Sequence, residues 1–383
     1  MLIGIDGIPL KDIKTGVGHY TFELARSLAL ASPTDQLEIV SPFSFFPGDH
    51  SEDPLDGWPP NLRLTQVKVN VWARNWWTIG LPRYIKRRSL DLFHGTNFDI
   101  PLWKRCPAIL TIHDLSDFLY PETHEARGVW RARRRLPFMA RTATQIVTHS
   151  ESVRREVIEH LQVSREKVIA IPAAARSVFR PLPPDQTIET RKRLGVEDEF
   201  LLFVGTIEPR KNLIVLLNAY RELLSATELH PQLVIAGKKG WLTDSLFSSL
   251  RELGIEERVL FTGYLSDNDL CALYSSCRVF IYPSKYEGFG LPPLEAMACG
   301  APVIASSIPS IREVTGETAR LVAPAGSDDL AQAIVTLLRD ENERQRLSVA
   351  GLKRAQQFSW NHTAQLMLGV YHQAWEKYHR DRG

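Results

Sequence analysis

Short apolar runs, each followed by a helical stretch, recur along this chain and constrain its fold more than any other feature. In the first half they include "LIGID" at residues 2–6, "AILTIHD" at 108–114 and "TQIVTHS" at 144–150. After a stretch rich in Pro, Ala and Arg, the alternation restarts with "FLLFVG" at 200–205 and continues through "RVFIYP" at 278–283. Continuous runs of Val, Ile and Leu are typical of strands covered on both faces, hence of parallel sheets flanked by helices.

Because the pattern occurs twice, we expect an α/β protein made of two doubly wound, Rossmann-like domains with a cleft between them. A chain of 383 residues is also too long for one ordinary hydrophobic core. The predicted boundaries are residues 1–175 for the first domain, 176–198 for a linker, and 199–358 for the second domain. In such sheets ligands bind beyond the carboxyl ends of the strands.

Composition limits the class of function. The net charge of +2 argues against nucleic acid as a partner of the whole protein. The cysteines, which show no CxxC pairs, suggest reduced residues of a cytoplasmic protein: Cys106, Cys271, Cys277 and Cys299. No secretion signal is recognisable at the start, and no apolar run approaches the roughly 18–20 residues that span a bilayer.

Two glutamates surround a Gly-Pro-rich bend in "YEGFGLPPLEAMACG", residues 286–300. We expect Glu287 on a loop at a strand end, and Glu295 in the first turn of a helix over about 292–299. Carboxylates accept hydrogen bonds from sugar hydroxyls. A helix start with a dipole-favoured glutamate and one solvated loop glutamate is the alternative, and these residues alone leave it open.

Backbone amides of the same bend favour an anionic ligand. The N–H groups of Phe289, Gly290 and Leu291 precede the positive end of the predicted helix, where phosphate oxygens bind readily. In "FVGTIEPRKNL" the cations Arg210 and Lys211 stand near another helix start, where they oppose the dipole unless an anion arrives.

Three weaker signals lie in the first half. Gly16 and Gly18 separate the first strand from its helix and allow close approach of a phosphate, although a tight turn explains them equally well. His113 follows a strand and could donate to a substrate oxygen, and His94 in "LFHGTN" is a weaker case of the same kind. A basic helix near residues 127–141 could contact an anionic membrane surface, or simply pack on its own domain.

Together these motifs resemble the retaining GT-B glycosyltransferases called glycosyl transferases group 1, or family four. The specific motif is E-x7-E, which Glu287 and Glu295 satisfy. "GTIEPRKN" and "TIHDL…YPETH" are similar to the bacterial mannosyltransferase-like subgroup that builds lipopolysaccharide and exopolysaccharide. The resemblance covers most of the chain and implies that residues 359–383 form a helix crossing back to the first domain.

The resemblance also implies a role for each residue. Glu287 would contact hydroxyls of the donor sugar, Glu295 the nucleotide ribose, and His113 the neighbourhood of the sugar. The cations would stabilise the departing diphosphate. The amides of Phe289, Gly290 and Leu291 would help to bind sugar and phosphate. Gly16 and Gly18 would line the phosphate site, and Tyr264 and Leu265 would lie in a loop beside the base. One departure is Thr206, where many relatives carry arginine.

The implied reaction moves a hexose from a nucleotide diphosphate sugar, with GDP-mannose as our prediction, to a glycan or polyprenyl-linked acceptor. The first domain would bind the acceptor and the second the nucleotide sugar. No separate cofactor and no metal are expected, and the protein would work in the cytoplasm or at the inner face of the membrane. UDP-glucose or another hexose donor, a glycosidase, a nucleotide-sugar epimerase and a non-catalytic binding subunit remain as alternatives.

Overall fold

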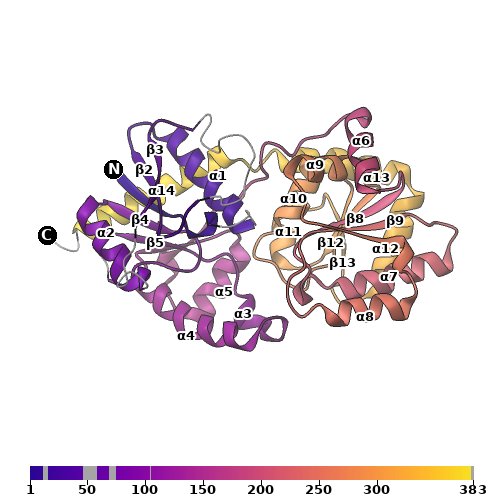
Figure 1. The fold of residues 1–383 in the computed structure, drawn as a ribbon, viewed down its shortest axis with the longest axis horizontal. Helices are drawn as coiled ribbons and strands as arrows, with labels where there is room; N and C mark the ends of the chain where they lie inside the picture. The colour runs from indigo at the N-terminus through magenta and orange to yellow at the C-terminus, as the bar shows by residue number, and fades with distance from the viewer. Residues whose placement is uncertain (12–15, 46–57, 69–74, 104, 381–383) are drawn as a thin grey trace. The chain divides into compact units, whose positions relative to one another are not determined.

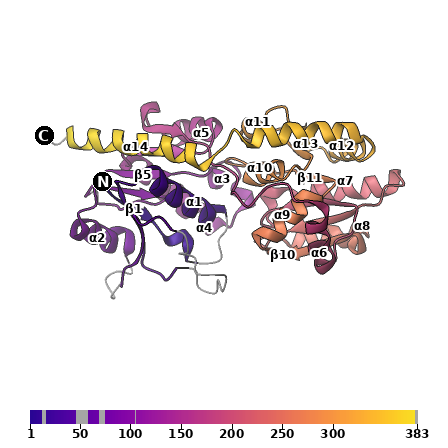
Figure 2. The same ribbon diagram turned by 90° about the horizontal axis from the view of Figure 1, so that it is seen from above.

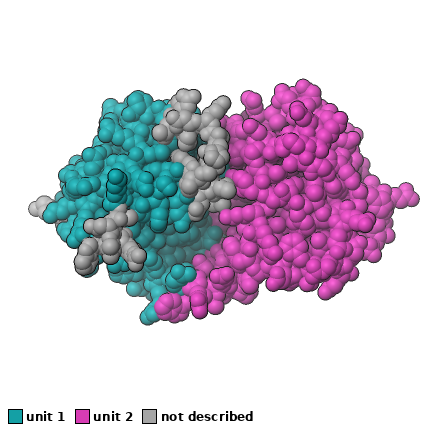
Figure 3. All heavy atoms as spheres, viewed as in Figure 1, with its two compact units in different colours: residues 1–115, 131–173, 359–383 teal, residues 116–130, 174–358 magenta. Residues whose placement is uncertain are grey.

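The computed structural model describes residues 1–11, 16–45, 58–68, 75–103 and 105–380. The chain divides into two compact units, coloured teal and magenta in Figure 3. Unit 1 comprises Met1–Leu115, Arg131–Ala173 and Ser359–Gly383, and unit 2 comprises Ser116–Trp130 and Ala174–Phe358.

The sheet of unit 1 has seven strands in the order β3-β2-β1-β4-β5-β6-β7, and its neighbours pair in parallel. The strands are β1 (Leu2–Asp6), β2 (Gln36–Ser41), β3 (Leu62–Gln66), β4 (Leu92–Gly95), β5 (Ala108–Thr111), β6 (Gln145–Thr148) and β7 (Val168–Ala170). The helices are α1 (Gly16–Ala31), α2 (Leu81–Arg88), α5 (Glu151–Leu161) and α14 (Trp360–Arg380). Figure 2 shows α14 running along unit 1, where it packs against α1.

The sheet of unit 2 has six parallel strands in the order β10-β9-β8-β11-β12-β13. Figure 1 labels four of them, β8, β9, β12 and β13. The strands are β8 (Phe200–Val204), β9 (Gln232–Ala236), β10 (Val259–Gly263), β11 (Val279–Tyr282), β12 (Val303–Ser306) and β13 (Arg320–Val322). The helices are α3 (Ser116–Leu119), α6 (Pro184–Leu194), α7 (Leu213–Ala226), α8 (Asp244–Leu253), α9 (Asp267–Ser276), α10 (Leu291–Ala298), α11 (Pro309–Thr315), α12 (Ser327–Arg339) and α13 (Glu341–Ala355). Helix α4 (Ala126–Thr142) belongs to unit 2 up to Trp130 and to unit 1 from Arg131.

The central strands are buried along their whole length, as the apolar runs predicted. Every residue of β8, β9, β11 and β12 is buried. Helices cover these strands, with α7 packed against α12 and α10 against α13. The prediction of two doubly wound parallel sheets is confirmed.

The sequence interpretation missed some elements. The stretch 176–198, expected to be a linker, contains the eleven-residue helix α6, which packs against α9. Only Thr187 of α6 is buried, so no apolar periodicity marks the helix in the sequence. The edge strands β7 and β13 have three residues each and are only partly buried, which makes them too short for an apolar run.

None of the helices in the described part of the chain combines the length and the apolar character that crossing a bilayer would require.

Candidate active site

The candidate site of unit 2 lies where the order of the strands reverses. β8 and β11 are neighbours, but the chain passes from β8 outward to β9 and β10 before it returns to β11. In open α/β sheets ligands bind beyond the carboxyl ends of the strands at such a reversal. The loop after β8 carries Arg210 and Lys211, and the loop after β11 carries Glu287. The fold therefore brings Glu287 to two adjacent cations that stand 76 and 77 positions before it in the chain.

The carboxylate of Glu287 lies between two cations. Its Oε1 accepts a hydrogen bond from Nζ of Lys211 at 2.6 Å, and its Oε2 accepts one from Nη1 of Arg210 at 3.0 Å. Burial alone would raise the pKa of Glu287, but the charges of Lys211 and Arg210 outweigh it and lower the pKa to about 2. Glu287 is therefore ionised at neutral pH, where it accepts hydrogen bonds and has no proton to give.

Arg210 has two further partners in the same loops. Its Nη1 donates to the carbonyl oxygen of Tyr286 at 2.9 Å, and its Nη2 donates to Oε1 of Glu208 at 2.6 Å. Glu208 is buried, so the guanidinium lies between two buried carboxylates. Glu208 and Glu287 therefore already supply negative charge to these cations, and the predicted contact of Arg210 and Lys211 with a diphosphate stays a prediction.

Lys211 is buried, with only 7% of its surface exposed, which is unusual for lysine. Burial lowers its pKa, as does the charge of Arg210, and Glu287 opposes both. The ammonium also donates to the hydroxyl of Tyr282 at 2.8 Å. An ammonium has three N–H donors, so these two bonds leave one for a ligand. Nothing in the sequence singled out Glu208 or Tyr282, which are ordinary residues of a loop and a strand end.

Gly290 fixes the turn between Glu287 and α10. Its φ is +109°, and a Cβ at this position would lie 2.5 Å from Cδ1 of Ile311. Any larger residue would therefore suffer both backbone strain and a clash. Phe289 beside it is buried and packs edge-on against Phe358, with ring centroids 5.9 Å apart. The loop that was predicted to offer backbone amides thus has a conformation that only glycine adopts easily.

Glu295 lies in the second turn of α10. The helix begins at Leu291, one residue earlier than expected, and has no acidic residue in its first turn. The placement of Glu295 in the first turn, and with it the explanation by the helix dipole, is therefore wrong. Its carboxylate instead has side-chain partners: Nη2 of Arg176 is 3.5 Å from Oε1, and the hydroxyl of Tyr274 donates to Oε2 at 3.3 Å. Burial raises the pKa of Glu295 to about 7, against the opposing charge of Arg176.

The raised pKa of Glu295 predicts a pH dependence of stability. The folded protein binds this proton more tightly than the unfolded chain, in which the pKa is 4.5. The contribution of Glu295 to the stability of the fold is therefore most favourable below pH 4.5 and is lost as the pH rises through about 7. Glu295→Gln removes this titration. We expect the free energy of unfolding of the wild type to fall relative to that of the variant by up to about 1.4 kcal/mol per pH unit in this window. Thermal midpoints of both proteins across the window measure it, and parallel curves would refute it.

The residues expected beside the base follow β10. Tyr264 is 47% exposed, whereas Leu265 is buried. In the sheet β10 is separated from β8 by β9. Tyr264 and Leu265 therefore lie at the same edge of the sheet as Lys211, two strands away.

In unit 1 the glycine pair lies at the start of α1. Gly16 and Gly18 are inside the first turn of the helix rather than before it. The rest of the expected turn, residues 12–15, lies outside the described residues. A Cβ at Gly16 would meet no atom within 4 Å. The backbone at Gly16 is therefore open, and its predicted phosphate-lining role stays a prediction.

His113 lies two residues beyond β5, and both of its ring nitrogens are hydrogen-bonded within unit 1. Nε2 is 2.7 Å from the carbonyl oxygen of Thr96, and Nδ1 is 2.8 Å from Nε2 of His149. A carbonyl only accepts, so Nε2 of His113 carries the proton and Nδ1 accepts from His149. Burial lowers the pKa of His113, which keeps the ring neutral. Its predicted role beside the donor sugar remains untested by these contacts.

His94 belongs to the core of unit 1. It is fully buried and lies between two hydroxyls, with Nδ1 2.6 Å from Tyr371 and Nε2 2.7 Å from Thr111. Burial lowers its pKa to about 3. These contacts tie α14 to the sheet and give His94 a structural role.

Comparison with known protein families decides the class of this chain. The family model described as "Glycosyl transferases group 1" matches residues 185–354, and the model described as "Glycosyltransferase Family 4" matches residues 14–174. O-antigen chain mannosyltransferase B of Escherichia coli is 31% identical over 378 residues, which cover 95% of this chain and 97% of the relative. The chain belongs to glycosyltransferase family 4.

One further relative and one solved structure match this glycosyltransferase over different shares of their length. The serotype-specific mannosyltransferase WbdA of E. coli is 34% identical over 230 residues, which cover 59% of this chain and only 28% of WbdA. Among solved structures, sucrose-phosphate synthase from Thermosynechococcus elongatus superposes with a TM-score of 0.78 at 20% identity, covering 98% of this chain and 100% of the other. At that identity the second match concerns the GT-B fold alone.

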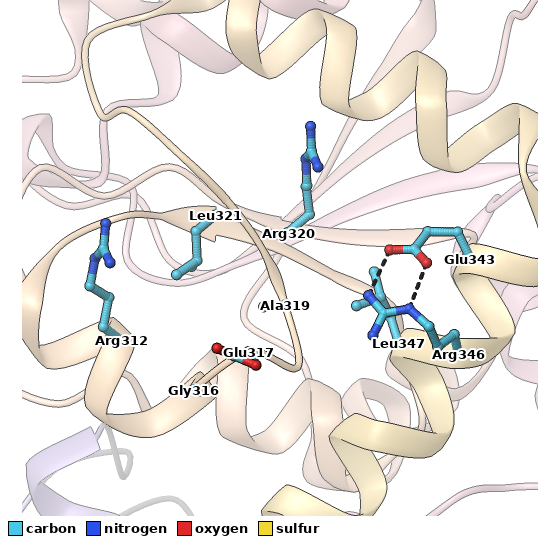
Figure 4. Close-up of a pocket in the computed structure, with 9 residues that line it drawn as sticks. All are labelled: Arg312, Gly316, Glu317, Ala319, Arg320, Leu321, Glu343, Arg346 and Leu347. Carbon is cyan, nitrogen blue, oxygen red and sulfur yellow. Dashed lines mark hydrogen bonds and ion pairs between the residues drawn. The ribbon is translucent and has the colours of Figure 1, made fainter.

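The glycosyltransferase has a basic pocket in unit 2 that contains none of the predicted site residues. Its volume is about 490 Å³, and it lies between α11, β13 and α13. Figure 4 shows Arg312 at one side and Arg346 paired with Glu343 at the other, with bonds of 2.6 and 2.8 Å. Arg320 and Glu317 also line it. Its arginines are exposed, and Glu343 pairs with Arg346, so Arg320 is a suitable control site for a substitution at Glu287.

Across the described residues, no group of three His, Cys, Asp or Glu side chains is arranged to hold a metal ion.

Proposed function

We propose that this glycosyltransferase moves a hexose from a nucleotide diphosphate sugar to a hydroxyl of a glycan or lipid-linked acceptor in the synthesis of cell-surface polysaccharide. For the donor we propose GDP-mannose, because the E. coli relatives named above are mannosyltransferases. Retention of the anomeric configuration and independence of metal ions are part of the proposal.

The observation that carries the proposal is the cluster of Glu287, Lys211 and Arg210 at the strand reversal. In the reaction the bond from the sugar's anomeric carbon to the diphosphate oxygen breaks, a bond from that carbon to the acceptor oxygen forms, and the proton of the acceptor hydroxyl passes to the departing diphosphate. Negative charge develops on the diphosphate, and preorganised cations in a buried site stabilise such charge strongly. Lys211 is buried, held by Glu287 and Tyr282, and retains one N–H for the leaving group.

The order of the strands supports an extended donor. The loop expected at the base follows β10, the cations follow β8 and Glu287 follows β11, which spans three strand spacings. At about 4.8 Å per spacing this is about 14 Å, enough to place base, diphosphate and sugar in a row. Glu287, ionised and oriented by two cations, would accept hydrogen bonds from sugar hydroxyls, and Glu295 from the ribose.

The paired carboxylates also raise the glycosidase alternative, which needs a carboxylic acid and a second carboxylate beside one glycosidic bond. In this protein Glu287 is bound by Lys211 and Arg210, an arrangement that hydrolysis of a simple glycoside does not require. Together with the family to which the chain belongs, this arrangement supports transfer from a nucleotide sugar.

A panel of nucleotide sugars tests the proposal by thermal shift. We expect GDP-mannose to stabilise the protein and UDP-glucose to do so much less, because a ligand stabilises only the state that it binds. At one hundred times its Kd, the donor adds about 2.7 kcal/mol to the free energy of unfolding. If UDP-glucose alone stabilised the protein, the donor would be UDP-glucose and not GDP-mannose. Hydrolysis of an aryl glycoside, without stabilisation by any nucleotide sugar, would overturn the proposed function.

We also propose that helix α4 contacts the inner face of an anionic membrane. The helix contains six arginines and no acidic residue. Trp130 and Phe138, two turns apart, are 60% and 52% exposed. Exposed aromatic residues among arginines are typical of helices that lie in the headgroup region of anionic bilayers. Such contact would place the enzyme beside a lipid-linked acceptor.

Vesicle flotation checks the membrane contact. We expect binding to vesicles that contain phosphatidylglycerol and little binding to pure phosphatidylcholine. Replacing Trp130 and Phe138 by serine should weaken partitioning by roughly tenfold or more, since each aromatic side chain contributes about 1.5–3 kcal/mol when buried. Val349→Ser serves as the control, because Val349 is 57% exposed but lies on α13, about two hundred residues along the chain from α4. Equal binding of both variants would refute the contact.

A further inference from the structure

Arg176 is a buried arginine in the segment by which the chain enters unit 2. Unit 2 resumes at Ala174, two residues before it. Arg176 is only 8% exposed, and its guanidinium carbon lies 4.7 Å from the ring centroid of Phe179. Its Nη1 forms an ion pair with Asp267, and its Nη2 lies 3.5 Å from Oε1 of Glu295. Arginine is rarely buried, and here the two carboxylates compensate for the loss of hydration of its charge. The side chain is therefore fixed in one position relative to Glu295.

Four ionisable groups act on the Glu295 carboxylate. Arg176 favours its charged form, as does the hydroxyl of Tyr274, which donates to Oε2 at 3.3 Å. Asp267, at the start of α9, disfavours it by repulsion. Cys299, directly after α10, is a further neighbour: the hydrogen bond with Cys271 and burial raise the pKa of its thiol, and the charge of Glu295 adds to them. Arg176 is therefore the one cation among these described neighbours.

We propose that Arg176 is a positioning residue for donor binding, which stabilises the ionised form of the Glu295 carboxylate and orients it so that it accepts hydrogen bonds from the ribose hydroxyls. This inference rests on the proposed function, in which Glu295 binds the ribose. A carboxylate has about four lone-pair sites, and Arg176 and Tyr274 take one on each oxygen. Sites therefore remain on both oxygens for a pair of neighbouring hydroxyls.

The protonated and ionised forms of Glu295 are close enough in free energy at neutral pH for one neighbouring cation to decide which form predominates. Burial raises the pKa of Glu295 to about 7 even with Arg176 present. Without this guanidinium the pKa would rise further, and the carboxyl would be largely protonated at neutral pH. A protonated carboxyl accepts hydrogen bonds less strongly than a carboxylate. The planar fork of arginine also fixes the geometry, because its two terminal nitrogens reach Asp267 and Glu295 together while its guanidinium carbon lies over the ring of Phe179.

The test is the affinity for GDP, or for UDP if the donor screen selects it, measured by titration calorimetry between about pH 6 and about pH 9. We expect Arg176→Met to weaken binding about tenfold near pH 7, the equivalent of one pKa unit. The difference in affinity between Arg176→Met and the wild type should become smaller toward pH 9, where Glu295 ionises in both proteins. Arg176→Lys keeps a positive charge and should therefore show nearly the same dependence of GDP affinity on pH as the wild type. At saturating donor kcat should change little, so that the effect appears in KM.

Arg193→Met is the matched control. Arg193, on α6, forms an ion pair with Asp269 of α9, two residues after Asp267, but its side chain is 57% exposed and it has no bond to Glu295. This variant should bind GDP like the wild type at every pH. If Arg176→Met behaves like Arg193→Met, or weakens binding equally at all pH values, Arg176 has no positioning role.

Glu295→Gln separates this inference from the proposed function. If Glu295 binds the ribose, Glu295→Gln weakens GDP binding without a pH dependence, and adding Arg176→Met to it has little further effect. If Glu295→Gln binds GDP as tightly as the wild type, the ribose role of Glu295 fails, and the inference about Arg176 fails with it. If Glu295→Gln weakens binding but Arg176→Met does not, only the inference about Arg176 fails.

Discussion

Glu287→Gln is expected to lower kcat/KM about a thousandfold. Glutamine has nearly the same shape but no charge, so Lys211 and Arg210 lose the anion that holds them at 2.6 and 3.0 Å. The donor sugar also loses a charged hydrogen-bond acceptor. Removing one preorganised electrostatic group from an active site typically costs about 10²–10³ in kcat, and here one change disturbs both the sugar contact and the cations. Steady-state kinetics with GDP-mannose and acceptor measure the effect.

The choice of glutamine matters because the ion cluster is buried. Glu287→Ala would leave two cations without their partner, and breaking a buried ion pair costs about 3–5 kcal/mol. Loss of activity in that variant could therefore reflect loss of fold. Arg320→Ala, in the basic pocket of Figure 4, is the control that should leave kcat/KM unchanged. Folded Glu287→Gln with kcat/KM within a few-fold of the wild type would remove Glu287 from the site.

Lys211→Met is expected to lower kcat by about 10²–10³ and to weaken binding of GDP. Methionine fills a similar volume but brings no positive charge to the developing diphosphate. Glu287 would keep only Arg210 as its cation, and its pKa would rise from about 2 toward its ordinary value. Single-turnover rates and GDP titrations separate the effect on the chemical step from the effect on binding.

Lys285→Met is the matched control for Lys211→Met. Lys285 lies in the loop after β11, two residues before Glu287, but its side chain is exposed. Its backbone N–H donates to the carbonyl oxygen of Arg210 at 2.9 Å, a bond that the substitution keeps. We expect this variant to retain wild-type kinetics. If both lysine variants lose the same small amount of activity, general surface charge would explain the result and Lys211 would have no special role.

The fold was predictable because its physical cause is local. Strands such as β8 and β11 are buried on both faces and therefore appear in the sequence as unbroken apolar runs. Helix α6 escaped detection for the opposite reason, since it buries only Thr187 and has no apolar stripe. Edge strands of three residues, such as β13, are too short for any periodic signal.

The site was predictable only in part. Spacing and strand ends placed Glu287, Arg210 and Lys211 on loops, but no pattern in the sequence shows that they form one ion cluster. Their contacts arise from the reversal of strand order between β8 and β11, which is a property of the tertiary fold. Arg176 was hidden for a similar reason, because it lies among alanines and prolines and gains its meaning only from Glu295, 119 residues later.

A crystal structure of the enzyme with GDP-mannose tests the central claim most directly. We expect the diphosphate oxygens to lie about 3 Å from Nζ of Lys211, with sugar hydroxyls on Glu287 and ribose hydroxyls on Glu295. Diphosphate bound elsewhere, for example between Arg312 and Arg320 in the pocket of Figure 4, with Lys211 and Glu295 not contacting the nucleotide, would contradict it.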